Sequence, residues 1–387
     1  MSSFVSRPLL IRSVSILGGA IGFYLPLSVV PLYASARNAG AATVALLVAT
    51  VIGELATPRL VTRVGYRWAL TLGLTLLGLP TIFLLLGPVP ALILAVSVVR
   101  GFGFAICTVA GGALTAALIP PDRRGEGLAF VGLVSGVSGL LALPAGVWAA
   151  DRWGFAPVFV ATTAGTLLAL VSVPALPARD AAAPKPAPDS AGILAGLRRP
   201  ALNRPAALFA TSTAAVGVLV TYLPLAGAEG PGWIVALALL LQPAAATAAR
   251  WIAGRLGDRH GLRRLLVPGL SLSAVGMGAL AWTGSAAAVL AGALVFGAGF
   301  GILQNTTLAL MYAGAPAGSE DTVSAVWNIA YDLGMAAGAF VAGLTVTSIG
   351  YGWTFLLAAA AMLPALLLVP APDSHLHKLV GDGDLSA

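Results

Sequence analysis

The sequence predicts an all-α integral membrane protein, with twelve transmembrane helices in two pseudo-symmetric six-helix bundles. Its composition and an internal repeat lead to this prediction. Of the 387 residues, 58% are hydrophobic and only 9% are charged, whereas soluble proteins average roughly 25% charged residues. Because so few charges cannot cover a surface that faces water, we expect most of the chain to be surrounded by lipid.

The apolar residues form runs of the length that a membrane requires. A helix needs about 20 apolar residues to cross the hydrocarbon core, and charged residues and Gly/Pro clusters divide the chain into twelve such runs. The predicted spans are residues 10–33, 40–62, 66–87, 89–118, 127–150, 154–176, 204–227, 232–256, 262–284, 286–314, 321–348 and 351–370.

The basic residues set the expected orientation. With the N-terminus inside, the inner segments hold seventeen arginines and lysines and the outer segments hold only Arg37 and Arg152. Basic residues collect in cytoplasmic loops, so we expect both termini in the cytoplasm and the chain in the inner membrane of the cell. The net charge of +7 is then a topology signal, and no nucleic-acid partner is expected.

The single Cys107 excludes a disulfide within the chain, and we expect no metal or cofactor.

The two halves of the chain repeat one another. RLVTRVGYR at 59–67 aligns with RLGDRHGLR at 255–263, and GFGF at 101–104 aligns with GAGF at 297–300, both at an offset of 196 residues. Six spans per half is an even number, which predicts a parallel repeat. We therefore expect an N-terminal bundle over 1–176, a cytoplasmic linker over 177–203, and a C-terminal bundle with a short cytoplasmic tail over 204–387. The proline-rich linker is either plain or carries a short helix on the membrane surface.

Several of these motifs resemble those of the major facilitator superfamily of secondary transporters, and the resemblance covers nearly the whole chain. The stretch 254–264, GRLGDRHGLRR, is similar to the family's GxLaDrxGrRR loop, and its first-half copy carries Pro58 and Thr62 in place of the glycine and aspartate. RGFG at 100–103 resembles the family's RxxG element. The glycines of 132–146 resemble its GxxxGPxxGG antiporter element, with Val137 in place of the proline of that element.

The resemblance implies a central cavity that opens alternately to each side, with a gate on the cytoplasmic side. By this likeness Asp258 is expected to cap the start of the fifth span, where the helix dipole favours an anion. The expected gating residues are Gly254, Asp258, Arg259, Gly261 and Arg63.

The tetrapeptide YLPL occurs at 24–27 and again at 222–225, toward the predicted outer ends of spans one and seven. Proline ends or bends a helix in the membrane. Tyr24 and Tyr222 therefore have two open interpretations. They line matching faces of the cavity beside a hinge, or they place hydroxyl groups at the membrane interface.

Charges inside the membrane are the strongest candidates for function, because each costs roughly 2.5–3.5 kcal/mol or more at mid-bilayer. Asp332, Arg100 and Glu54 lie deep in spans eleven, four and two, which the family resemblance places close together. We expect a cluster in which one acid lacks a full partner and carries a proton. The alternative is an ion-pair network that only locks the helices together. Arg250, the repeat mate of Glu54, either reaches the cytoplasmic edge or binds an anionic substrate.

Other polar residues are predicted to line the substrate cavity, although such groups also hold helices together. The expected cavity residues are Tyr24, Tyr222, Gln304, Asn305, Trp327, Asn328 and Tyr331.

The predicted function is proton-coupled efflux of a small organic molecule, a drug or secondary metabolite, by a monomeric antiporter-like protein. The expected partners are this substrate, protons and the lipid bilayer. One alternative is a proton-symport importer of a small nutrient. Another, of a different class, is a membrane enzyme or a transporter-like receptor. An enzyme is not expected, because the sequence has no HExxH motif, no nucleophile elbow and no histidine within a span.

Overall fold

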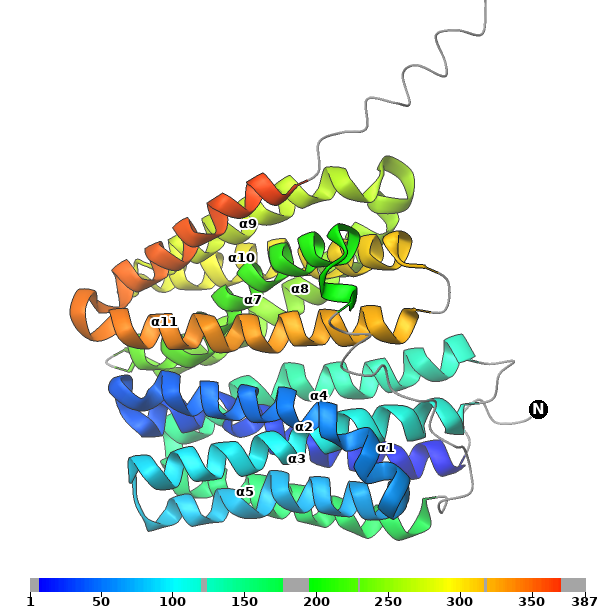
Figure 1. Ribbon diagram of the computed structural model, residues 1–387. Helices are drawn as coiled ribbons and strands as arrows, with labels where there is room; N and C mark the ends of the chain where they lie inside the picture. The colour runs from blue at the N-terminus through cyan, green and yellow to red at the C-terminus, as the bar shows by residue number, and fades with distance from the viewer. Residues whose placement is uncertain (1–6, 120–123, 177–194, 229, 317–318, 370–387) are drawn as a thin grey trace, which may run out of the picture.

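The computed structural model describes residues 7–119, 124–176, 195–228, 230–316 and 319–369 (Figure 1). Every regular element within these ranges is a helix. The elements of the first half are α1 (Arg7–Leu27), α2 (Val29–Gly78), η1 (Leu79–Leu86), α3 (Pro90–Leu118), α4 (Arg124–Trp153), α5 (Phe155–Leu168) and η3 (Ala169–Ala175). Those of the second half are α7 (Pro200–Ala226), α8 (Gly232–His260), η5 (Leu262–Leu265), α9 (Leu266–Ala279), α10 (Ala286–Gly314), α11 (Glu320–Met362) and η6 (Leu363–Leu368). Most of the predicted linker, residues 177–194, lies outside the described ranges.

The prediction of twelve spans is confirmed once the breaks inside the long helices are counted. Eight stretches of the described chain are long and apolar enough to cross a membrane. The longest, Arg7–Leu86, contains three predicted spans because α2 breaks at Ser35 and Gly65. Another, Thr322–Leu368, contains two because α11 breaks at Gly350. The remaining span is α9 with the short helix before it.

Glycines at matching positions in the two halves turn the chain between spans. Gly65 and Gly261 have φ angles of 79° and 89°, and Gly154 and Gly350 have φ angles of 81° and 80°. A side chain is strained in this left-handed region, and glycine adopts it freely. Both pairs are separated by 196 residues, so the repeat in the sequence is also a repeat in backbone conformation.

The repeated glycine motifs bring helix backbones into contact. A Cβ atom on Gly101 of α3 would lie 2.2 Å from the carbonyl oxygen of Leu46 in α2. At the equivalent place in the second half, a Cβ atom on Gly297 of α10 would lie 2.1 Å from the carbonyl oxygen of Gln242 in α8. Small residues allow this close approach where lipid offers no hydrophobic force to drive helices together. The sequence repeat GFGF and GAGF therefore marks the same helix pair in each half.

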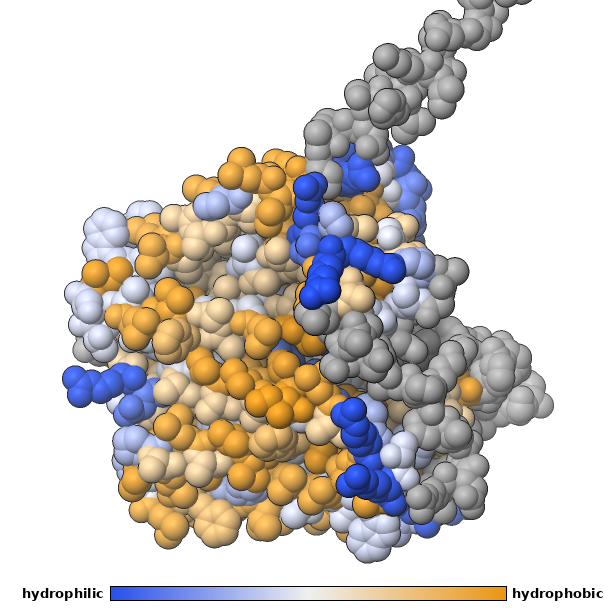
Figure 2. All heavy atoms as spheres, viewed as in Figure 1, coloured by the Kyte–Doolittle hydropathy of each residue, from blue (hydrophilic) through white to orange (hydrophobic). Residues whose placement is uncertain are grey.

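The helices form two groups, α1 to α5 and α7 to α11, which lie side by side in Figure 1. The contacts between the groups join α2 to α7 and α11, and α4 to α8. On the face shown in Figure 2, apolar side chains cover the middle of the molecule and hydrophilic side chains gather toward its two ends. This distribution fits a chain that is surrounded by lipid along its middle.

We call the end of the molecule where α1 and α7 finish the outer end, following the predicted orientation. There the two groups are joined by an outer seam of buried side chains. The hydroxyl groups of Thr43 in α2 and Thr221 in α7 are hydrogen bonded at 3.0 Å. Beside them, the Tyr222 hydroxyl lies against Gly40 of α2 and donates to the carbonyl oxygen of Ala339 in α11 at 3.3 Å. All three side chains are buried, so the outer seam is closed.

We expect Gly297→Leu to destabilise the protein, because its side chain would push α10 away from the backbone of α8. Overpacking of this kind costs about 1–3 kcal/mol, occasionally more. Thermal unfolding of the detergent-solubilised protein, followed by size-exclusion chromatography, measures the loss. The control is Gly112→Leu in α3, where a Cβ atom has no neighbour within 4 Å. Equal unfolding temperatures for the two variants would contradict the proposed close contact.

Candidate functional site

Two carboxyl groups from opposite halves of the molecule, Glu54 and Asp332, are electrostatic neighbours. Glu54 lies in the 36–64 segment of α2 and is half-buried, and Asp332 lies in α11 with 7% of its surface exposed. Their side chains are close enough to interact electrostatically. The Thr108 hydroxyl of α3 lies against the Glu54 carboxyl. Within the described chain neither acid forms an ion pair, and proton exchange by either carboxyl group stays a prediction.

Three more polar side chains surround these acids. Tyr24 of α1 and Tyr331 of α11 are electrostatic neighbours of each other and of Asp332. Arg250 of α8 is a neighbour of Tyr331 and remains exposed. We call Tyr24, Glu54, Arg250, Tyr331 and Asp332 the central cluster. Four helices contribute to it, two from each half, so any movement of one half against the other changes its geometry.

The expected arrangement of Arg100 is wrong in one respect, because its guanidinium forms no ion pair with any described acid. Arg100 is 1% exposed, and its terminal nitrogen donates to the carbonyl oxygen of Gly22 in α1 at 3.0 Å. Its Nε atom has no hydrogen-bond partner among the described residues. The packing of α1 against α3 turns the guanidinium toward the α1 backbone, and a proton-coupling role for Arg100 stays a prediction.

The two YLPL tyrosines occupy different environments, although the repeat makes them equivalent in sequence. Tyr24 is half-buried in the central cluster, and one edge of its ring lies beside Gly139 of α4. Tyr222 is fully buried in the outer seam. Pro26 and Pro224 lie close to the ends of α1 and α7. The structure therefore places Tyr24 in the central cluster and Tyr222 in the outer seam, where its hydroxyl lies against Gly40 of the first half.

An aromatic group forms one wall next to the cluster. The rings of Phe209 and Trp327 stack with centroids 4.6 Å apart, and Tyr331 packs on Phe209 at 6.0 Å and on Phe300 at 6.4 Å. The Nε1 atom of Trp327 is buried with no hydrogen-bond partner among the described residues. Apolar rings beside a few polar groups are typical of small-molecule pockets.

The remaining predicted cavity residues lie on α10 and α11. Gln304 and Asn305 are partly buried, and Asn328 is exposed. The Asn305 amide nitrogen lies near Gly254 of α8, 3.8 Å from the position that a Cβ atom would take there. Asn305 therefore lies at the boundary between α8 and α10, and its role as a ligand contact stays a prediction.

The predicted gate lies at the inner end of α8. Asp258 and Arg259 are exposed in the last turn of that helix, and Gly261 ends it with a positive φ. Arg63 is also exposed. The start of the fifth span, which Asp258 is expected to cap, falls partly outside the described residues, so this contact stays a prediction.

The sequence does not lead us to expect that Arg12 is buried, because we assign it to the basic residues of the inner segments that set the orientation. Arg12 of α1 is 5% exposed, and it donates from Nε to Thr115 of α3 at 3.3 Å and from a terminal nitrogen to Ser15 at 2.5 Å. A Cβ atom on Gly111 would collide with its guanidinium. The position of Arg12 inside the apolar run LLIRSVSI was the available signal.

Two halves of six spans, with a polar cluster held between them, define a polytopic membrane transporter. The sequence matches the family description "Major Facilitator Superfamily" over residues 12–339 and 232–384. The chain belongs to this family, whose members carry small molecules.

Relatives in this family include antibiotic resistance proteins. The chain is 32% identical to the "Chloramphenicol resistance protein" of Streptomyces lividans, over 65% of this chain and 66% of that protein. It is 28% identical to the "Tetracenomycin C resistance and export protein" of Streptomyces glaucescens, over 40% of this chain. The match spans only 28% of that second protein's length.

Solved structures of the family share the fold at low sequence identity. The nucleoside transporter NupG superposes with a TM-score of 0.76 at 12% identity, over 95% of this chain and all of that chain. This likeness establishes the architecture, and the chemistry of the site rests on the residues of this chain.

We expect Tyr222→Phe to lower the thermal stability of the protein, because it removes a buried hydrogen bond between α7 and α11. Such a bond contributes about 0.5–1.5 kcal/mol. The matched control is Tyr24→Phe, whose hydroxyl has no hydrogen-bond partner among the described residues. Thermal unfolding in detergent measures both variants. A larger loss of stability for Tyr24→Phe would contradict the assignment of Tyr222 to the outer seam.

Proposed function

We propose that this transporter exports a small organic compound, a drug or secondary metabolite, in exchange for protons. The observation that carries the proposal is the pair of carboxyl groups, Glu54 and Asp332, which come from opposite halves and lie close enough to interact electrostatically. Acidic residues inside a membrane protein mark proton and substrate pathways by default. The resistance and export functions in the names of two relatives favour the outward direction.

Export then proceeds by alternating access. The outer seam is closed, while Arg250 and Asn328 on the inner side of the cluster keep exposed surface. A compound entering from the cytoplasm meets Trp327 and Tyr331, which are backed by the buried ring of Phe209, and the central cluster. Asp332 or Glu54 takes up a proton from outside. This proton and the substrate compete for the same conformation of the transporter. The two bundles, 1–176 and 204–387, move as units joined by the linker.

The proposal extends to the cellular setting. We place the chain in the inner membrane with both termini in the cytoplasm, as the distribution of basic residues predicts. In this orientation Asp258, Arg259 and Arg63 lie on the cytoplasmic side, where they close the inner gate when the outer side opens. One chain contains both halves of the cavity, so a monomer suffices for transport.

We expect Asp332→Asn to abolish export while leaving the protein in the membrane, because asparagine cannot exchange a proton. The assay compares accumulation of fluorescent and antibiotic compounds in cells that lack their own pumps. Wild type should lower accumulation, and Asp332→Asn or a protonophore should restore it. The matched control is Asp332→Glu, which keeps a carboxyl group and should retain part of the activity.

A fully active Asp332→Asn variant would remove Asp332 from the coupling mechanism. If no compound in the panel changes its accumulation, uptake of sugars and organic acids is measured in the same strains. Proton-dependent uptake of one of these would contradict export and establish an importer.

We infer that Arg250 selects among substrates by charge, because it is the one exposed cation of the central cluster. Arg250→Gln should raise the half-saturating concentration of acidic compounds roughly tenfold, since a charge-assisted hydrogen bond is lost. Neutral compounds should be unaffected, and Arg250→Lys, which keeps the charge, is the matched control. The same affinity of wild type and Arg250→Gln for acidic compounds would contradict this role.

A further inference from the structure

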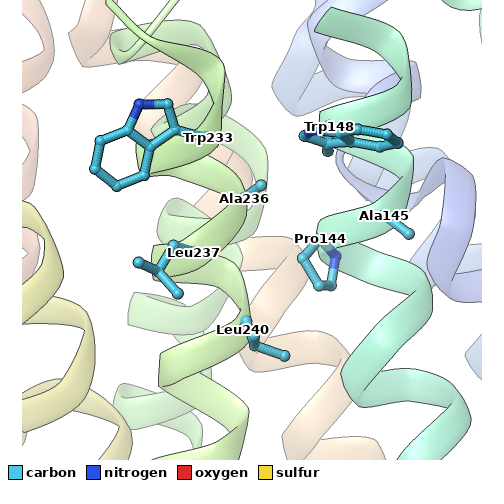
Figure 3. Close-up of a pocket in the computed structure, with 7 residues that line it drawn as sticks. All are labelled: Pro144, Ala145, Trp148, Trp233, Ala236, Leu237 and Leu240. Atoms are coloured by element: carbon cyan, nitrogen blue, oxygen red, sulfur yellow. The ribbon is translucent and has the colours of Figure 1, made fainter. Parts of the chain in front are cut away.

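An apolar groove crosses the boundary between the two halves of the molecule, away from the central cluster. It lies between α4 of the first half and α8 of the second, with a volume of about 380 Å³. Its lining residues are Pro144, Ala145, Trp148, Trp233, Ala236, Leu237 and Leu240. Figure 3 shows Trp148 and Trp233 at the same level on the facing helices, with Pro144 and Leu240 farther along.

The local sequence explains why α4 and α8 leave a hollow here. The two tryptophans are about half exposed, and the Trp233 ring extends away from α4 (Figure 3), so neither indole fills the space between the two helices. Ala145 and Ala236, one turn deeper, are too small to fill the space behind them. The outer end is closed by Asp151, whose carboxyl group lies against Gly232 at the first turn of α8.

The groove runs along the membrane normal over a length that suits a hydrocarbon chain. Trp233 is the second residue of α8 and Leu240 lies seven residues farther on, which is about 10 Å along the helix. Trp is common at the boundary between hydrocarbon and headgroups. The groove therefore starts at the level of the headgroups and extends into the hydrocarbon region, where acyl chains are the solvent.

A cation lies where the headgroup of such a lipid would be. Pro144, Trp148 and Arg152 are spaced by four residues along α4, so they form one stripe on the helix surface. Arg152 is exposed and forms no ion pair with any described residue. It is also one of only two basic residues that the topology places on the outer side. Arginine suits a phosphate because its guanidinium donates two parallel hydrogen bonds.

The geometry points to a phospholipid site: one acyl chain occupies the groove between α4 and α8, and the phosphate group binds Arg152. The apolar lining would lose its dispersion contacts if the groove were empty, and water finds no hydrogen-bond partner in it. The site exists only while the outer seam is closed, since its two walls belong to different halves. A bound lipid therefore stabilises the closed outer side. The site requires the membrane fold alone, so it is independent of the direction of transport.

Tryptophan quenching by a brominated phosphatidylglycerol tests the site in detergent-solubilised, full-length protein. We expect a saturable quenching component at low lipid-to-protein ratios, and its loss when Trp148 and Trp233 are both replaced by phenylalanine. Ala145→Phe fills the groove and should abolish the component. The matched control is Ala161→Phe, which adds the same ring at an exposed position of α5 and should leave it unchanged.

The headgroup contact is tested separately. Arg152→Gln should weaken lipid binding roughly fivefold, the effect of one basic residue beside an anionic membrane surface, whereas Arg37→Gln should not. Brominated diacylglycerol, which lacks the phosphate, should bind wild type as weakly as phosphatidylglycerol binds Arg152→Gln. Glycerol phosphate without acyl chains should not compete.

Quenching that never saturates, or that survives in Ala145→Phe, would overturn the site. Equal binding of the two brominated lipids to wild type would overturn the role of Arg152.

Discussion

The whole structure depends on one constraint, that lipid offers no hydrogen-bond partner to the backbone or to a polar side chain. The constraint makes each span a helix and requires the helices to associate without a hydrophobic driving force. In this chain glycines meet that requirement by allowing backbone contact, as Gly101 does against α2 and Gly297 against α8. It also confines the polar side chains of the central cluster to the boundary between the two halves, where protein and water can solvate them.

The two halves have the same backbone conformation at equivalent positions, but they place different polar side chains at this boundary. Equivalent glycines turn the chain at equivalent places, but Glu54 in the first half corresponds to Arg250 in the second. Likewise Tyr24 reaches the central cluster, whereas Tyr222 is buried in the outer seam. In the proposed export cycle, this asymmetric set of charges would bind substrate and proton in one cavity while both bundles move alike.

The outer seam and the lipid groove lie on adjacent parts of the same boundary. Thr43, Thr221 and Tyr222 close it on the inside of the molecule, and the contact of Asp151 with Gly232 closes it near the lipid. Opening the outer side breaks both sets of contacts and dismantles the groove. The proposed lipid site and the proposed export cycle therefore share this boundary, and a lipid that binds only its closed conformation would be linked to substrate binding.

The sequence alone determined that the chain spans the membrane many times, the twelve spans and the repeat, and it predicted the depth of Glu54, Arg100 and Asp332 along their helices. Depth can be read from sequence because every residue of a helix advances it by about 1.5 Å. Only the tertiary structure decided which residues at a given depth meet. It paired Arg100 with the backbone of Gly22 instead of the acids, buried Arg12 beside Thr115, and separated Tyr24 from Tyr222. These pairings depend on how each helix is rotated and packed against segments up to hundreds of residues away, and no local pattern in the sequence records that rotation.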